Sequence, residues 1–121
     1  MSDQLSERLP SPADVQSNLA ALAQLLRKAH HLGPDAQREL AEIVEELAKA
    51  LASVPAPSGE LAALAASTGH LVAALHHQEN QGILSDARAR VEKAIVSAEV
   101  KAPFAAGIAQ RLVDVLTDLG I

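Results

Sequence analysis

The sequence predicts an all-α protein, built as a small antiparallel bundle of four to five helices. Apolar residues recur at intervals of three and four along most of the chain, which is the period of an amphipathic helix. Glycine and proline divide the chain into segments of helical length, and no segment alternates as a strand would. We expect residues 1–10 to be a flexible tail and residues 11–121 to form a single helical bundle domain.

The first two predicted helices are separated by a glycine. Ser11 is a candidate cap of the first helix, and Pro12 suits its first turn. Gly33 is the expected stop signal, and the second helix begins directly after it. The second helix has an acidic outer face, on which Glu45 is expected to pair with Lys49 one turn away. A linker rich in serine and proline follows.

The central stretch, residues 61–78, carries no Lys, Arg, Asp or Glu. Its spacing predicts a helix with a leucine stripe and a second face of alanine, and a helix exposed to water normally carries charge on that face. We therefore expect the other helices, or a second subunit, to cover it. The candidate interface residues on this face are Ala62, Ala66, Gly69 and Ala73. Burial of both faces inside one bundle is the competing interpretation.

The fourth and fifth predicted helices follow Gly82. This glycine is expected to end the central helix, although a continuous helix is the alternative because the apolar spacing persists beyond it. Ser85 is a candidate start of the fourth helix, and Pro103 of the fifth. Phe104 belongs to the predicted apolar stripe of the fifth helix, which Gly120 is expected to end.

The composition disfavours several classes of function. The formal net charge is −5 and there is no basic patch, so binding to nucleic acid or to an anionic membrane surface is disfavoured. Cysteine is absent, which removes disulfides, thiolate catalysis and cysteine-ligated metals. The polar N-terminus does not resemble a secretory signal. Polar residues and three histidines in the central stretch argue against a membrane span.

Histidines are the remaining candidates for chemistry. His30 and His31 lie at the end of the first predicted helix, and His76 and His77 near the end of the central one. Adjacent histidines point about 100° apart on a helix, so neither pair chelates a metal alone. A zinc-type site would need both helix ends to meet, whereas antiparallel neighbours would separate them. We expect no metal, since polar groups suit helix C-termini.

The last third of the chain ends in the run LVDVLTDLGI (residues 112–121), which follows a break at Pro103. This pattern is similar to the C-terminal part of a bacterial family of short helical proteins, the domain-of-unknown-function 4404 family. The segment from Leu19 to Leu51 resembles the front half of that family more loosely, and residues 54–82 have no counterpart in its shorter members. The resemblance implies a small helical bundle and carries no activity or functional residues with it.

No nucleophile elbow, phosphate loop or dinucleotide fingerprint occurs in the sequence, so we expect no enzymatic activity and no cofactor. We expect a structural or protein-interaction module of the bacterial cytoplasm that acts through helix–helix self-association. A homodimer is the simplest assembly, and another protein is a further candidate partner. The alternative is a helical protein that binds a metal or small ligand through the histidines at its helix ends.

Overall fold

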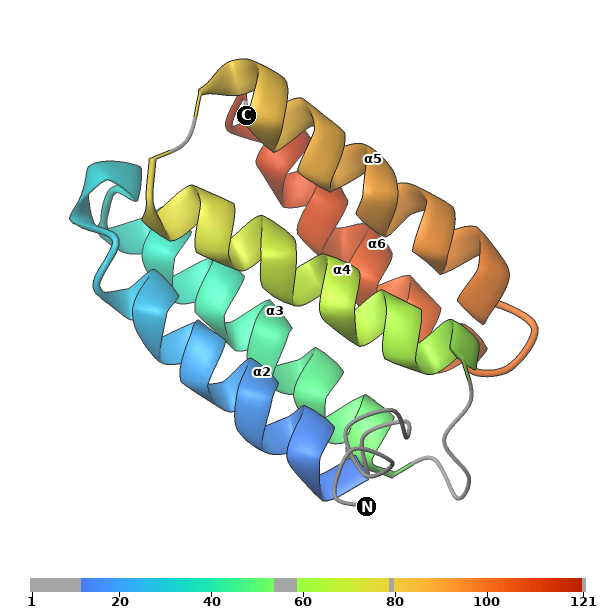
Figure 1. Cartoon of the computed structure of the whole chain (residues 1–121). Coiled ribbons are helices and arrows are strands. Elements are labelled where there is room, and N and C mark those ends of the chain that lie inside the picture. Colours follow the sequence, from blue (N-terminus) through green and yellow to red (C-terminus); the bar gives the residue numbers. More distant parts are fainter. Residues whose placement is uncertain (1–11, 54–58, 79, 121) are drawn as a thin grey trace, which may run out of the picture.

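The computed structural model describes residues 12–53, 59–78 and 80–120. Within these ranges the chain forms five α-helices, one short 3₁₀ turn and no strand, so the predicted all-α bundle is confirmed (Figure 1). The elements are α2 (Pro12–Arg27), η1 (His30–Leu32), α3 (Pro34–Ala52), α4 (Gly59–His76), α5 (Gln81–Ala98) and α6 (Pro103–Asp118). The predicted tail at residues 1–10, the cap at Ser11 and most of the linker lie outside the described residues.

The helices form two layers, with α2, α4 and α5 in one layer and α3 and α6 behind it (Figure 1). Each helix packs mainly on two others, which closes a ring in the order α2, α3, α6, α5, α4. Helices that follow each other in the chain run antiparallel (Figure 1). As a result, α2 and α4 are neighbours that run parallel, with their C-terminal ends at the same end of the bundle.

The core of the described residues is built of leucine, isoleucine, valine and alanine. The leucine stripe of α4 is buried, and so are the stripes of α3 and α6. Phe104 does not join this core, because it lies in the first turn of α6 and is 74% exposed. Its prediction as a core residue was therefore wrong: the stripe of α6 is set by Ala105, Ile108 and Leu112.

The first helix ends earlier than predicted, because the sequence placed its stop at Gly33 whereas α2 ends six residues before that glycine. α2 ends at Arg27, and the 3₁₀ turn η1 separates it from Gly33, which has a φ of 88°. This left-handed conformation suits glycine, which confirms Gly33 as the break. Gln37 is buried and its Nε2 donates a hydrogen bond to the Arg27 carbonyl at 3.0 Å. The side chain thus satisfies a terminal carbonyl of α2, a role that the sequence did not reveal.

The break between α4 and α5 lies earlier than predicted. α4 ends at His76, and Gln78 adopts a left-handed φ of 55°. Asn80 then caps α5, because its side chain accepts a hydrogen bond from the Ile83 amide at 3.0 Å. Gly82 is consequently inside α5, and both the stop at Gly82 and the start at Ser85 were wrong.

Two ion pairs on the outer faces join neighbouring helices, whereas Arg38 pairs with Asp35 along α3 at 3.3 Å. Glu45 of α3 bonds to Arg27 of α2 at 3.0 Å instead of pairing with Lys49 as predicted. Glu46 of α3 bonds to Arg111 of α6 at 3.1 Å. These pairs are partly exposed, so each contributes little to stability, but they mark the α3 surface as the charged side of the bundle.

Candidate functional site

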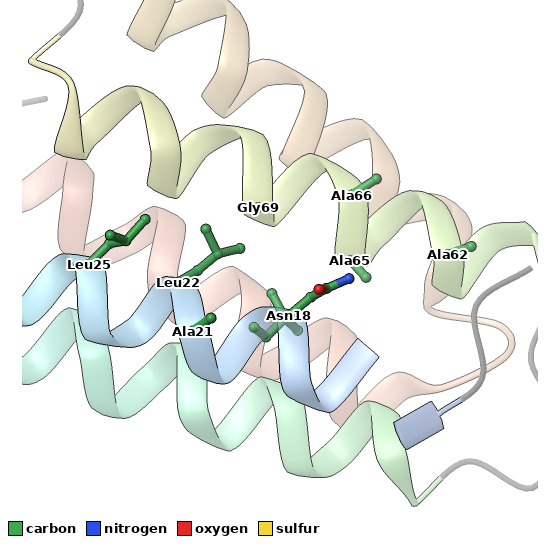
Figure 2. Close-up of a pocket in the computed structure, with 9 residues that line it drawn as sticks. Asn18, Ala21, Leu22, Leu25, Ala62, Ala65, Ala66 and Gly69 are labelled. Carbon is green, nitrogen blue, oxygen red and sulfur yellow. The ribbon is translucent and has the colours of Figure 1, made fainter. Parts of the chain in front are cut away.

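A groove of about 710 Å³ lies between the parallel helices α2 and α4 (Figure 2). Leu22 and Leu25 stand on the α2 side, and the α4 side consists of alanine and glycine (Figure 2). The residues that line the groove are Asn18, Leu19, Ala21, Leu22, Leu25, Ala62, Ala65, Ala66 and Gly69. Asn18 is the only polar side chain among them. A groove with so few polar groups suits an apolar occupant.

The two walls approach most closely at Gly69. A Cβ atom added to this glycine would lie 3.0 Å from Cδ1 of Leu22, which is tighter than ordinary van der Waals contact. Glycine in a helix interior costs about 1 kcal/mol relative to alanine. The close approach of Leu22 explains why glycine suits this position. It also fixes the register of the pair, with Leu22 of α2 level with Gly69 of α4.

Three of the four predicted interface residues meet in this groove. Ala62, Ala66 and Gly69 line it, whereas Ala73 lies further along α4 and is half-buried. Ala66 is exposed, and so is His70 on the same outer side of the helix. The single chain therefore buries the leucine stripe of α4 but leaves part of its alanine face open to solvent.

The exposed surface around the groove carries no charge over most of its length. α2 has no charged residue between Val15 and Leu26, and α4 has none between Leu61 and Gln78. The outer surfaces of α3, α5 and α6 each carry exposed charged residues. We call the outward-facing surface of these two helices, together with the groove, the α2–α4 face. It is the uncharged side of a protein whose formal net charge is −5.

The predicted histidine clusters lie at one end of the bundle. Because α2 and α4 run parallel, His31 reaches the end of α4, where its Nε2 lies 2.9 Å from the Leu75 carbonyl oxygen. The rings of His76 and His77 pack edge to face with centroids 5.3 Å apart. The expectation that antiparallel neighbours would separate the two ends does not apply to this pair. The side chain of His30 lies outside what the structure describes.

These histidines do not assemble a metal site among the described residues. Nowhere in that part of the chain do three histidine or carboxylate side chains gather closely enough to hold a metal ion. His31 instead provides a ring N–H at the C-terminal end of α4, where the Leu75 carbonyl accepts it in addition to the Gln78 amide at 3.2 Å. The geometry thus gives His31 the role of a cap.

Thr68 is a buried polar residue at the centre of α4. It is fully buried, and its Oγ1 has no hydrogen-bond partner in the described part of the chain. Thr68 lies among the buried leucines of α4, and nothing in the sequence indicates an unpaired hydroxyl there. An unpaired buried hydroxyl lowers the stability of the fold and offers a direct test of the packing.

Comparisons with known proteins give no further guide to the site. Neither family models, nor curated proteins, nor solved structures match the chain. The resemblance of residues 112–121 to the domain-of-unknown-function 4404 family therefore stays a prediction. In the ranges that the structure describes, no helix is long and apolar enough to cross a membrane.

Proposed function

We propose that this protein is a non-enzymatic interaction module that self-associates through its α2–α4 face, with a homodimer as the simplest assembly. The observation that carries the proposal is the groove itself, an uncharged hollow walled by leucine on one helix and by alanine and glycine on the other. Small residues let helix backbones approach closely, and leucine supplies apolar surface to bury.

The charge distribution supports the same face. Two copies with a net charge of −5 repel each other, and the acidic α3 surface would bring like charges together. The α2–α4 face allows approach without desolvating a charged side chain over most of its length. Exposed apolar surface of this kind is typical of sites that contact another protein.

The test is the substitution Ala66→Glu, with Ala89→Glu as its matched control. Ala66 is exposed in the single chain, so glutamate there is compatible with folding, but in the proposed dimer it would be buried without a partner. A penalty of about 3 kcal/mol would weaken association more than a hundredfold. Ala89 is exposed on α5, which is not part of the α2–α4 face, so we expect the same substitution there to leave association unchanged.

Native mass spectrometry at micromolar concentration measures the outcome, and circular dichroism confirms that each variant stays helical. We expect a dimer for the unmodified chain and for Ala89→Glu, and a monomer for Ala66→Glu. A monomeric unmodified chain, or a dimer that tolerates Ala66→Glu, would contradict the proposal.

Binding of a metal or small ligand by the helix-end histidines is the second candidate. The contact between His31 and the Leu75 carbonyl favours it only in bringing the ends of α2 and α4 together. Calorimetric titration with zinc at micromolar protein tests it, and we expect no heat of binding. Heat that disappears in His76→Ala would support a metal site and reverse this ranking.

A cytoplasmic and bacterial setting accompanies the main proposal. The absence of cysteine is compatible with a reducing compartment. Fractionation of cells that express the full chain would test the location.

A further inference from the structure

We propose that the second copy lies parallel to the first, so that α2 of each copy covers α4 of the other. This inference rests on the proposed self-association through the α2–α4 face and specifies how the two faces meet. It depends on the unequal size of the side chains on the two walls of the groove.

The α2–α4 face is complementary to itself. Its α2 side presents Leu22 and Leu25, which are partly buried and point toward the groove (Figure 2). Its α4 side presents the small residues Ala62 and Ala66, whereas Gly69 is covered by Leu22 of the same chain. When helices pack, large residues on one fit best against small residues on the other. The leucine side of one copy therefore fits the alanine surface of a second copy.

Symmetry links this fit to the direction of the helices. In a two-fold dimer, if residue i contacts residue j, then j contacts i. A two-fold axis that runs along the helices places α2 over α4 of the second copy and keeps all helices parallel. An axis across the helices places α2 over α2 and α4 over α4 in antiparallel order. Only the first arrangement brings leucine onto alanine at both contacts.

The register inside one copy fits this arrangement. An axis along the helices leaves the height of every residue unchanged. Since Leu22 is level with Gly69 within one chain, it is also level with Gly69 of the second copy. Leu25, about one turn further on, is then level with Ala73. This contact includes the fourth predicted interface residue, the one that does not line the groove.

Competing electrostatic terms are small on this face. Parallel helices bring like ends of their macrodipoles together, but such interactions are weak at a surface and are screened by salt. Burying the remaining exposed surface of Leu22 and Leu25 in each copy favours the contact. No charged side chain lies on α2 between Val15 and Leu26 to oppose the contact. Packing therefore decides the orientation.

The area of the face is sufficient for a modest dimer. α4 contains 18 residues, which makes it about 27 Å long. Two adjacent helices are about 20 Å wide, so two such faces bury roughly 1,080 Å² in flat projection. A specific interface needs about 1,000 Å², which places this one among the smaller examples. We expect association at micromolar concentration, within reach of chemical cross-linking.

The test uses single-cysteine variants, because the chain has no cysteine of its own. Ala21→Cys places a thiol at an exposed position of α2. Ala66→Cys places one at an exposed position of α4, at nearly the same height along the helix axes. One variant carries a mass tag, and the two are refolded together under mild oxidation. A disulfide requires Cα atoms less than about 7 Å apart. Ala89→Cys on exposed α5 is the control.

We expect the mixed disulfide between Ala21→Cys and Ala66→Cys to exceed either self-linked species several-fold. Self-linked dimers of each variant without the mixed product would show antiparallel packing and overturn the inference, while leaving self-association intact. A dimer by native mass spectrometry that forms none of these disulfides would overturn the inference by locating the interface elsewhere. A monomer would overturn both this inference and the proposed function.

Discussion

Thr68 gives the sharpest test of the packing within one chain. Its side chain is fully buried and its Oγ1 has no partner in the described residues. Leaving a buried hydroxyl unpaired costs about 1–3 kcal/mol. Valine has nearly the same shape as threonine and a similar helix propensity, so Thr68→Val removes this penalty without leaving a cavity.

We expect Thr68→Val to raise the free energy of unfolding by about 1–2 kcal/mol. For a domain of this size each kcal/mol shifts the melting temperature by about 4 °C. The chain has no tryptophan or tyrosine, so unfolding in urea is followed by far-ultraviolet circular dichroism. If the slope of the unfolding free energy against urea concentration (the m value) is unchanged, the gain lies in stability and not in the compactness of the unfolded chain.

Thr117→Val is the matched control, because the Oγ1 of Thr117 donates a hydrogen bond to the Val113 carbonyl at 3.0 Å. Thr117 is exposed, and the same substitution there removes a satisfied bond, so we expect no gain. Thr68→Ser, which keeps the hydroxyl and loses a methyl group, should lower stability by about 1 kcal/mol. The reasoning is refuted if Thr68→Val is no more stable than the unmodified chain, since the hydroxyl would then have a partner.

Two further predictions concern the C-terminal end of α4. His31→Ala removes the hydrogen bond to the Leu75 carbonyl and should lower the free energy of unfolding by about 0.5–1 kcal/mol, whereas His77→Ala, at an exposed position, should change it little. Urea unfolding of both variants checks this, and equal losses would argue against the cap. Gln78→Gly should raise stability by several tenths of a kcal/mol, because Gln78 has a φ of 55° that glycine adopts without strain. A lower melting temperature for this variant would contradict that account.

The sequence by itself determined the class of fold and most of the core. The intervals of three and four between apolar residues placed the leucine stripe of α4 correctly, because burial follows the helical period whichever helix lies opposite. Gly33 was also identified correctly, since a left-handed turn is a local property of the backbone. Gly120, with a φ of 80°, ends the last helix for the same reason.

Local signals failed where another residue supplied the same function. The break after α4 was assigned to Gly82, but Gln78 takes the left-handed conformation and Asn80, five residues before Ser85, provides the cap of α5. Glycine is the commonest residue after a helix C-terminus and serine is a common N-cap, but here Gln78 and Asn80 occupy these positions. Glu45 likewise found Arg27 on a neighbouring helix, a pairing that spacing within one helix cannot predict.

Only the tertiary structure decided which helices are neighbours. The sequence indicated an uncharged alanine face on α4, but it could not say whether other helices cover that face. The ring order places α2 beside α4 in parallel, which forms the groove and brings His31 to Leu75. Contacts between residues 44 apart in sequence depend on how whole helices pack. The spacing of apolar residues shows which face of a helix is buried, but it does not determine which helix lies opposite that face.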